Sequence, residues 1–469
     1  MCRETDIPRR SHEHPDQRPA NFGTDHPLIS EQAWLKVRNA WHDRPVTGRL
    51  DALVERRLSA IIRDRLDDEP AIGLQGARSV GKSTLLRAVA QQAGTVVIDL
   101  DDLDQRAAVS NDPMLFARGP SPVCIDEFQH VPEILDAIKA ELNQRLAPGR
   151  FVLTGSTRFE GVPRAAQSLT GRLHLLTVWP LSQGEIGGTH EHFVATLLTD
   201  PSEVLNADAS TTIRGEYVAR VLAGGLPLAL QRTGAARARW FDNYVQLVIE
   251  RDVLELSKVR QRDLLPRLLG RLASQTGQIL KITNAARSVG LEPSTAENYT
   301  RLLETVFLIH RLPAWGRTLR ARAVASPKIH LVDTGLAARI LGLTETKLAR
   351  NEPAAVTEFG HLLETFCVNE ILKQLSWIDD THTLGHWRTH DGAEVDLVIE
   401  TPDGTVTGIE IKASGRVTSS DTTGLRALRD TLGGAFNAGI VLHTGNHTQT
   451  LDDRIHAVPI DRLWSRISP

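Results

Sequence analysis

Several features are scarce in this sequence, and each scarcity excludes a class of protein. Only three cysteines, Cys2, Cys124 and Cys367, occur among 469 residues, too few and too scattered for a disulfide framework or a cysteine metal cluster. No apolar run approaches the roughly 18 residues that a transmembrane helix needs. The amino terminus also lacks the apolar core of a secretory signal. We therefore expect a cytoplasmic protein without a membrane partner.

An excess of charge of one sign is also missing. Lys and Arg number 54 against 57 Asp and Glu, which gives a formal net charge of −3. This balance excludes a globally basic nucleic-acid binder, although it leaves room for a local basic face. Hydrophobic residues at 41% and charged residues at 24% are typical of a globular protein. The length corresponds to about three domains.

Patterning along the chain predicts a tail and three units. Residues 1–27 contain prolines and histidines but few large apolar residues, which predicts a flexible tail. Residues 28–190 begin with helical spacing and then alternate short apolar runs with amphipathic helices, as in a parallel α/β sheet. Residues 211–345 are mostly helical in pattern. Residues 352–469 begin with a helix that leads into strand-like runs, which predicts an α+β or α/β unit.

The most specific motif is a glycine-rich loop that fits G-x-x-x-x-G-K-[ST], between an apolar run and an amphipathic helix. Backbone N–H groups of such a loop surround phosphates. Lys82 is expected to neutralise the β- and γ-phosphates, and Ser83 to bind Mg²⁺. This context disfavours the alternative, an ordinary turn with a solvated lysine. The sequence lacks the N-K-x-D motif that reads guanine, which favours ATP over GTP. The predicted ATP contacts are Gly76, Ala77, Arg78, Ser79, Val80, Gly81, Lys82, Ser83 and Thr84.

Two further strand ends are expected beside this loop. An apolar run ends in Asp126 and Glu127, and the carboxyl ends of parallel strands meet at one edge of a sheet. Asp126 is expected to hold Mg²⁺, and Glu127 to act as the general base for the attacking water. A third run ends in small polar residues, so Ser156 or Thr154 is expected near the γ-phosphate. An ordinary transition from strand to turn is the alternative for this third run.

The loop, the acid pair and the polar strand end resemble the Walker A, Walker B and sensor-1 elements of AAA+ ATPases. Over residues 45–469 the chain resembles a bacterial and archaeal family of predicted AAA+ ATPases with a restriction-endonuclease-like C-terminal domain. The resemblance implies Mg²⁺-dependent ATP hydrolysis. It also implies that Arg172 contacts a γ-phosphate, in its own chain or in a neighbouring subunit of a homo-oligomer. Arg158 and Arg164 are weaker candidates, and an ordinary pairing of Arg172 with a carboxylate or helix end is the alternative.

The middle segment resembles a helix-turn-helix. Gly290 separates a short helix from a longer one, for which Ser294 and Glu297 predict a capping box. The cations that follow the two helices predict a winged helix with a basic wing. Such a wing is suited to contact with DNA phosphates. A lid or a protein-docking module is the alternative. The expected wing cations are Arg311, Arg317, Arg320, Arg322 and Lys328, and the expected DNA readers are Thr295, Asn298 and Arg301.

Polar residues on two C-terminal strand-like runs predict a second site. Asp396 lies in the first run, and Glu410 and Lys412 share one face of the second. Two carboxylates can hold Mg²⁺, and a lysine can position water for phosphodiester hydrolysis. The spacing resembles the D…E-x-K site of restriction-endonuclease-like nucleases, in which Glu364 matches an additional acid. Surface salt bridges on an ordinary sheet are the alternative.

These observations leave three functional hypotheses. The first is an ATP-controlled enzyme that acts on DNA through its winged helix and nuclease-like unit. The second is a nucleotide-dependent switch whose C-terminal domain is an inactive binding or assembly module. The third is a transcription regulator that uses the winged helix.

Overall fold

A computed structural model of the protein describes part of the chain. The chain divides into two compact units, Met1–Asp43 and Arg44–Pro469, and the described residues all belong to the second. The predicted tail therefore lies outside the described residues, as do Arg164, Arg320 and Arg322. The described residues are 50, 53–159, 169–205, 209–253, 261–318 and 326–465.

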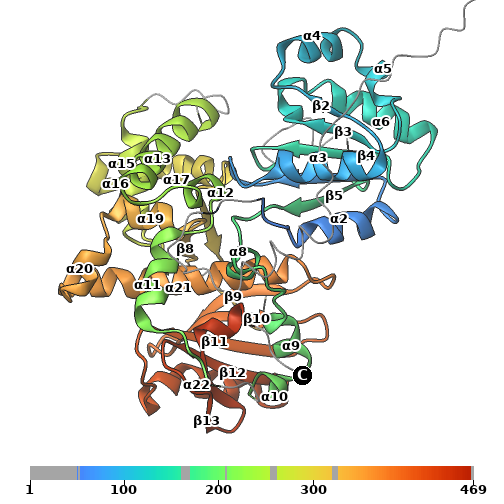
Figure 1. The fold of residues 1–469 in the computed structure, drawn as a ribbon. Coiled ribbons are helices and arrows are strands. Elements are labelled where there is room, and N and C mark those ends of the chain that lie inside the picture. The colour runs from blue at the N-terminus through green and yellow to red at the C-terminus, as the bar shows by residue number, and fades with distance from the viewer. Residues whose placement is uncertain are drawn as a thin grey trace, which may run out of the picture. The chain divides into compact units, whose positions relative to one another are not determined.

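The first half of the described chain forms a parallel sheet with the order β2-β3-β4-β1-β5 (Figure 1). Its strands coincide with the five apolar runs of the sequence, which confirms the predicted parallel α/β sheet. The strand and helix bounds are β1 Ala71–Gln75, β2 Val97–Asp99, β3 Val123–Asp126, β4 Phe151–Gly155, β5 Leu173–Thr177, α2 Leu58–Leu66, α3 Lys82–Ala93, α4 Leu103–Asn111, α5 Pro113–Ala117, η1 Phe128–His130, α6 Ile134–Gln144 and α8 Gln183–Gly187.

Helices cover both faces of this sheet, and this is why β1 and β4 are buried along their whole length. Val152 of β4 packs in one apolar cluster with Leu86 of α3, whereas Leu153 packs in another with Ile138 of α6. Because successive side chains of a strand point to opposite faces, the two clusters lie on opposite sides of the sheet. The carboxyl edge between these layers carries the glycine-rich loop.

The segment after the sheet packs against the C-terminal part of the chain. Helix α9 (Phe193–Thr199) contacts α21 (Pro353–Leu375). The backbone N–H of Val194 donates to Gln374 Oε1 over 3.1 Å, and Asn437 Nδ2 donates to the carbonyl of Leu197 over 3.3 Å. Residues between the predicted domains are therefore part of a packed core. The helices that follow are α10 Pro201–Leu205, α11 Arg214–Ala223, α12 Pro227–Leu230, α13 Gly234–Leu247 and η3 Val248–Val253.

The middle segment adds a helical group and an antiparallel sheet with the order β6-β8-β7. Helix α17 begins at Pro293 with Glu292 as its N-cap, because proline at the first position has a φ already suited to a helix. The predicted capping box of Ser294 and Glu297 is therefore wrong. The bounds are α15 Leu264–Ala273, β6 Gln278–Ile279, α16 Ile282–Val289, α17 Pro293–Thr305, β7 Ile309–Leu312, β8 Lys328–Leu331, α19 Thr334–Leu341 and α20 Glu345–Ala349.

The C-terminal sheet is mixed, with the order β13-β14-β12-β11-β10-β9. Strands β10 and β11 pair antiparallel around the turn at Pro402–Gly404, and β11 connects through α22 to the parallel strand β12. Leu397 packs in the same cluster as α21, whereas Val398 packs with α22, so the two helices cover opposite faces. The bounds are β9 Thr383–Arg388, β10 Glu394–Glu400, β11 Val406–Lys412, η4 Ser419–Thr422, α22 Thr423–Leu432, η5 Gly433–Ala435, β12 Phe436–His443, β13 Gln449–Asp452, β14 Ile455–Pro459 and η6 Ile460–Leu463.

Among the described residues, no helix combines the length and the apolar character needed to cross a membrane.

Candidate nucleotide site and carboxylate pocket

The glycine-rich loop lies between the end of β1 and the start of α3. A Cβ on Gly76 would lie only 2.3 Å from the carbonyl oxygen of Val178, so the chain fits there only with glycine. Gly81, the residue before α3, has a φ of 99°, which side chains other than glycine rarely adopt. The loop then leads directly into the first turn of α3, where Ser83 and Thr84 follow Lys82. Free N–H groups at such a turn bind phosphate.

Lys82 is buried, with 4% of its surface exposed. Its Nζ donates to the carbonyl oxygens of Gly76 over 2.9 Å and of Ala77 over 3.0 Å. Burial lowers the pKa of Lys82, and the nearby charge of Glu127 opposes that shift. The lysine thus contacts neutral dipoles of its own loop, at the position where phosphate oxygens are expected.

The side chain of Arg78 pairs with an acid outside the glycine-rich loop. Its Nε donates to Asp252 Oδ1 over 2.7 Å and to Oδ2 over 2.5 Å, and Asp252 belongs to η3. The carbonyl of Arg78 accepts a hydrogen bond of 3.1 Å from the hydroxyl of Tyr244 in α13. The contact of Arg78 with ATP stays a prediction. Its side chain ties the loop to the helices after the sheet.

The predicted acid pair lies at the carboxyl end of β3. Asp126 is buried and accepts a hydrogen bond from the hydroxyl of Thr154. Burial raises the pKa of Asp126, while the hydroxyls of Thr154 and Ser83 oppose that shift. The backbone N–H of Glu127 donates to Thr154 Oγ1 over 3.1 Å. The structure thus brings Ser83 and Asp126 together. Hydroxyl and carboxylate oxygens are ligands that Mg²⁺ prefers, so this donor set fits the ion.

Glu127 has a φ of 52° and a ψ of 50°, a left-handed conformation that is costly for a residue with a side chain. Gln129 holds this side chain: its amide donates to Glu127 Oε2 and, over 3.2 Å, to Ser156 Oγ. Ser156 therefore reaches the acid pair through Gln129, whereas Thr154 contacts it directly. The sequence analysis missed Gln129, because a glutamine after an acid pair carries no specific signal.

Arg172 lies at the opposite edge of the sheet. Strands β1 and β5 are parallel, with Ala71 paired to Leu173 and Gln75 to Thr177. Arg172 precedes β5, whereas the glycine-rich loop follows β1. The intervening strand spans about 13 Å at roughly 3.3 Å per residue. Contact of Arg172 with a nucleotide in its own chain is therefore wrong, and contact with a neighbouring subunit stays a prediction.

The other arginine candidate that is described, Arg158, contacts the middle segment. Its Nε donates to the carbonyl of Glu304 over 3.1 Å, and its guanidinium lies 5.0 Å from the centre of the Phe307 ring. Both partners lie at the end of α17 and just beyond it. Arg158 therefore links the strand end of β4 to the middle segment.

A cavity of about 660 Å³ contains the second group of predicted site residues. Glu364, Asp396, Glu410 and Lys412 line it from the C-terminal part of the chain, and residues of β6 and β8 line it from the middle segment. The lining side chains also include the cations Arg271, Lys281, Lys328 and Arg388 and the acid Glu394. The cavity therefore brings together the predicted carboxylates, but it adds a lysine that the sequence analysis placed elsewhere.

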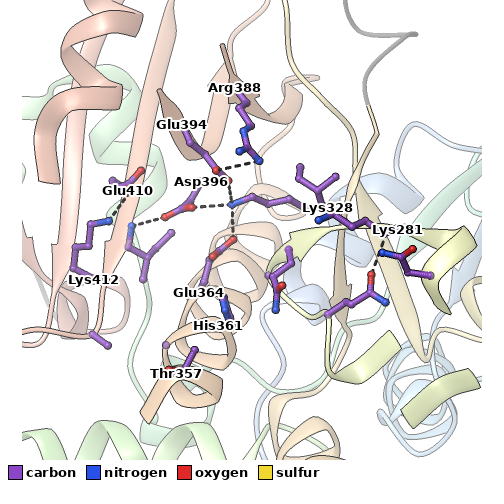
Figure 2. A pocket seen from close by; sticks show the side chains of 18 of the residues that line it. Lys281, Lys328, Thr357, His361, Glu364, Arg388, Glu394, Asp396, Glu410 and Lys412 are labelled. Atoms are coloured by element: carbon purple, nitrogen blue, oxygen red, sulfur yellow. Dashed lines mark hydrogen bonds and ion pairs between the residues drawn. The ribbon is translucent and has the colours of Figure 1, made fainter. Parts of the chain in front are cut away.

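Lys328 occupies the centre of the carboxylates (Figure 2). Its Nζ lies 2.8 Å from Glu364 Oε1, 2.9 Å from Glu394 Oε1 and 2.8 Å from Asp396 Oδ1. Only 1% of Lys328 is exposed. Burial alone would lower the pKa of this amine, but Asp396, Glu364 and Glu394 together raise it. Lys328 is therefore a buried ammonium ion, and its predicted place on an exposed basic wing is wrong.

Asp396 and Glu410 line one cavity but have separate partners. Asp396 Oδ2 accepts a hydrogen bond of 2.9 Å from the N–H of Ile411, and Glu410 Oε1 accepts one of 2.7 Å from Lys412 Nζ. Burial and the charge of Asp396 raise the pKa of Glu410 to about 8, while Lys412 opposes that shift. Burial likewise raises the pKa of Glu364, while Lys328 opposes that shift.

The expected metal position shared by Asp396, Glu410 and Glu364 is therefore not formed. Across the described ranges, no group of three or more His, Cys, Asp and Glu side chains could hold a metal ion. Lys328 binds the oxygen of Asp396 that would face such an ion, and a backbone N–H binds the other. The sequence offered only a weak signal for the burial of Lys328: it begins a short strand whose alternate residues, Ile329 and Leu331, are apolar and are fully buried in the structure.

The expected DNA-contacting residues divide into two groups. Arg311 pairs with Glu297 over 2.8 Å and is half-buried, so it is not a free wing cation. Asn298 and Arg301 are exposed on α17, and Arg301 Nη2 donates to Asn298 Oδ1 over 2.6 Å. Thr295 is half-buried and Arg317 is exposed.

Comparison with family models identifies the class of the first part of the chain. Residues 68–187 match a family described as "AAA domain". This range contains the glycine-rich loop, the acid pair and the parallel sheet, so the chain carries an AAA-type P-loop ATPase domain. Residues 214–347 match "Domain of unknown function (DUF8612)", and residues 359–463 match "Domain of unknown function (DUF4143)".

Two proteins with similar sequences extend over most of the chain. They are the "Uncharacterized protein Rv2008c" of Mycobacterium tuberculosis and the "Uncharacterized protein Mb2031c" of Mycobacterium bovis. Each is 29% identical over 415 residues, which cover 88% of this chain and 85% of the relative.

Solved structures with detectable similarity include the Walker-type ATPase PABY2304 of Pyrococcus abyssi, at 17% identity and a TM-score of 0.37 over 64% of this chain and 99% of that one. The Thermotoga maritima RuvB Holliday junction branch migration motor follows at 15% identity and a TM-score of 0.27, over 58% of this chain and 94% of that one.

Proposed function

We propose that the protein binds ATP with Mg²⁺ at the glycine-rich loop and hydrolyses it, and that hydrolysis controls how the rest of the chain acts on DNA. The observation that carries the ATPase assignment is the meeting of two features at the carboxyl edge of the sheet: the glycine-rich loop with Lys82 inside it, and the acid pair Asp126 and Glu127 held by Thr154. Ser83 and Asp126 would hold Mg²⁺, which offsets negative charge on the phosphates.

Other side chains of the protein bind the phosphates and activate the attacking water. Lys82 exchanges its two carbonyl contacts for phosphate oxygens, because its Nζ already lies inside the loop. Glu127 orients the attacking water and accepts its proton, and Gln129 keeps that carboxylate in place. Arg172 supplies positive charge to the nucleotide of a neighbouring subunit, so the active form is a homo-oligomer.

The DNA-directed part of the proposal draws on the middle and C-terminal segments. The order α15, β6, α16, α17, β7, β8 with a small antiparallel sheet is typical of a winged helix, in which the second helix of the pair enters the major groove. Exposed Asn298 and Arg301 on α17 support this role. The order α21, β9, β10, β11, α22, β12 supports a restriction-endonuclease-like fold for the last segment.

Phosphate release from ATP tests the ATPase assignment. Lys82→Ala should weaken ATP binding, and Glu127→Gln should preserve binding but slow hydrolysis by about 10²–10⁴-fold. Lys139→Ala, which removes an exposed lysine from α6 of the same domain, is the matched control and should leave both unchanged. Hydrolysis at the parental rate by both site variants would refute the assignment.

Binding to duplex DNA, measured by fluorescence anisotropy at several salt concentrations, tests the second part. Arg301→Ala should weaken binding and reduce its dependence on salt, because a phosphate contact is lost. Arg63→Ala on α2 removes an equally exposed arginine and should have no effect. Equal binding by both variants and the parent would remove α17 as the DNA contact.

A second candidate function is favoured by one observation. Lys328 binds three of the carboxylates in the C-terminal pocket, which leaves Asp396 poorly suited to metal-dependent cleavage. In this alternative the protein is a nucleotide-dependent switch whose C-terminal domain binds partners without cutting DNA. Incubation with plasmid, linear and single-stranded DNA in Mg²⁺ or Mn²⁺, with and without ATP, separates the two. Nicking that Asp396→Ala abolishes would support the enzyme.

A further inference from the structure

The carboxylate pocket has an unusual source of positive charge. Glu364 lies on α21, and Glu394 and Asp396 lie on β10, whereas Lys328 enters from β8 of the three-stranded sheet. One nitrogen therefore collects one oxygen from each of three carboxylates, all at 2.8 or 2.9 Å. The contacts to Glu364 and Asp396 are hydrogen bonds, and the contact to Glu394 is an ion pair. Figure 2 shows the three acids converging on this single atom.

We propose that Lys328 is the built-in cation of this pocket: it takes the position of a divalent ion, and removing its amine converts the pocket into a divalent-cation site. The inference concerns the C-terminal carboxylates alone, so it holds whether or not the protein hydrolyses ATP.

The charges in the pocket support this exchange. Four acids, Glu364, Glu394, Asp396 and Glu410, line the cavity. Three cations contact them: Lys328, Arg388 at 3.9 Å from Glu394, and Lys412 at 2.7 Å from Glu410. Among the described residues, Lys328 is the only cation paired with Glu364 and with Asp396. Without Lys328 these two buried carboxylates would have no ion-pair partner, and only Arg388 would remain near Glu394. Carboxylates that repel each other in a buried site favour uptake of a cation.

The oxygen atoms that Lys328 releases are suitable ligands. Carboxylate oxygens are preferred by Mg²⁺, Mn²⁺ and Ca²⁺, at distances of about 2.0–2.6 Å. The oxygens around Lys328 lie farther out, at 2.8 and 2.9 Å, so each must move inward by about 0.2–0.9 Å to reach a metal ion. Glu410 Oε2 is a buried atom without a hydrogen-bond partner among the described residues, and it is available as a further ligand. The open side of the cavity admits water for the remaining positions.

The lysine also has a consequence for assembly of the chain. A metal ion would hold Glu364, Glu394 and Asp396 to each other, but it would leave β8 free of them. Lys328 instead ties β8 to α21 and β10 through three ion pairs. Because the cation in this pocket is a lysine and not a metal ion, the pocket also joins the middle segment to the C-terminal segment.

Calorimetric titration of the full chain with Mn²⁺, in the absence of nucleotide, tests the proposal. Every protein carries Asp126→Asn, which removes the expected metal ligand of the ATP site. Lys328→Ala should bind about one Mn²⁺ per chain, at least about 100-fold more tightly than the parent. Adding Asp396→Ala to this variant should abolish the gain. Lys281→Ala is the matched control, because it removes an exposed lysine from the same cavity without touching the three acids, and it should gain nothing.

Two results would overturn the proposal. One is a parent protein that already binds Mn²⁺ in a manner abolished by Asp396→Ala. The other is a folded Lys328→Ala protein with no gain in affinity. If Lys328→Ala fails to fold, Lys328→Met keeps the aliphatic stem, and its Tm should rise with Mn²⁺ while that of the parent does not. Failure of both variants to fold even with Mn²⁺ would show that the metal cannot replace the amine. ATP hydrolysis, measured without Asp126→Asn, distinguishes these failures from a failure of the ATPase proposal.

Discussion

Two buried lysines, Lys82 and Lys328, have opposite surroundings. Lys82 is 4% exposed and contacts two backbone carbonyl oxygens, whereas Lys328 is 1% exposed and contacts three carboxylates. Burial is unfavourable for the charge of both. For Lys82 it lowers the pKa, but for Lys328 the three acids more than reverse that effect. The difference lies in the partners and not in the depth of burial.

The comparison shows how the same residue type serves binding in one place and structure in another. Neutral carbonyl groups compete weakly for an ammonium ion, so Lys82 can transfer to phosphate oxygens. Within the described residues neither Asp126 nor Glu127 forms an ion pair with Lys or Arg, so the acids of the ATP site keep their charge for Mg²⁺ and water. Lys328, in contrast, already forms ion pairs with three carboxylates of the protein.

The largest expected effect is a loss of ATP turnover when Arg172, the arginine proposed to act on a neighbouring subunit, is removed. Arg172→Ala should lower ATP turnover by about 10³-fold or more, as loss of an arginine finger does. Because Arg172 cannot reach its own nucleotide, mixing this variant with Lys82→Ala should restore part of the activity at mixed interfaces. Steady-state phosphate release from the mixture measures this recovery.

Arg145→Ala, which removes an exposed arginine that follows α6, is the control for Arg172→Ala. Normal turnover by Arg172→Ala would remove the arginine from the site. Absence of recovery in mixtures shown to co-assemble would remove only the action between subunits.

The next effect tests the comparison of the two lysines through the free energy of unfolding. Lys328→Ala should lower the free energy of unfolding by about 3–5 kcal/mol, because it leaves buried carboxylates without their cation. Lys82→Ala should cost no more than about 1 kcal/mol, since its lost hydrogen bonds are offset by removal of a buried charge. Urea unfolding followed by tryptophan fluorescence measures both. Equal losses would mean that the partners of the two lysines do not determine their roles.

A smaller effect concerns the pair that ties the glycine-rich loop to η3. Arg78→Ala should lower the free energy of unfolding by about 1.5–3 kcal/mol, the usual value for hydrogen bonds to a charged group. Asp252 is buried, so Asp252→Asn alone should also be unfavourable. Combining the two substitutions should cost less than the sum of the single losses, and a double-mutant cycle gives the coupling. Strict additivity would argue against the pair.

The smallest effect is a dependence on pH at Glu410. Its pKa is about 8 in the folded protein, above the usual value, chiefly because of burial. A carboxyl whose pKa is raised by folding stabilises the fold at low pH, and this contribution is lost as the pH rises through the folded pKa. Glu410→Gln cannot ionise, so its stability relative to the parent should increase from about pH 5 to pH 9. A parallel pH profile for both proteins would contradict the assignment.

The sequence predicted the grouping of the loop and the strand ends for a physical reason. The loop, the acid pair and the strand end are local motifs, and a parallel sheet brings strand ends together whatever the rest of the chain does. Asp126, Thr154 and Ser83 meet as this rule requires. Arg172 precedes β5, so the predicted parallel sheet already placed it at the edge opposite the loop, and its contact with a neighbouring subunit stays a prediction.

The carboxylate pocket was predicted only in part. Asp396, Glu410 and Lys412 lie on two strands that form a hairpin, so their proximity follows from a short-range pattern. Lys328 lies 68 residues before Asp396 and belongs to another sheet. Its basic neighbours in the sequence suggested a solvated wing, whereas the three acids that pair with it are remote in sequence. A pairing between distant charges has no periodicity from which it could be inferred.

Helix α9 is synthesised well before the helix that it packs against. Phe193, Val194 and Leu197 are buried, and the helix packs against α21. Yet α9 ends at Thr199 and α21 begins only at Pro353, a gap of 154 residues. At roughly 5–20 residues per second, the ribosome needs about 8–30 s to supply the partner helix. During that interval the apolar residues of α9 have been synthesised but the helix that covers them has not.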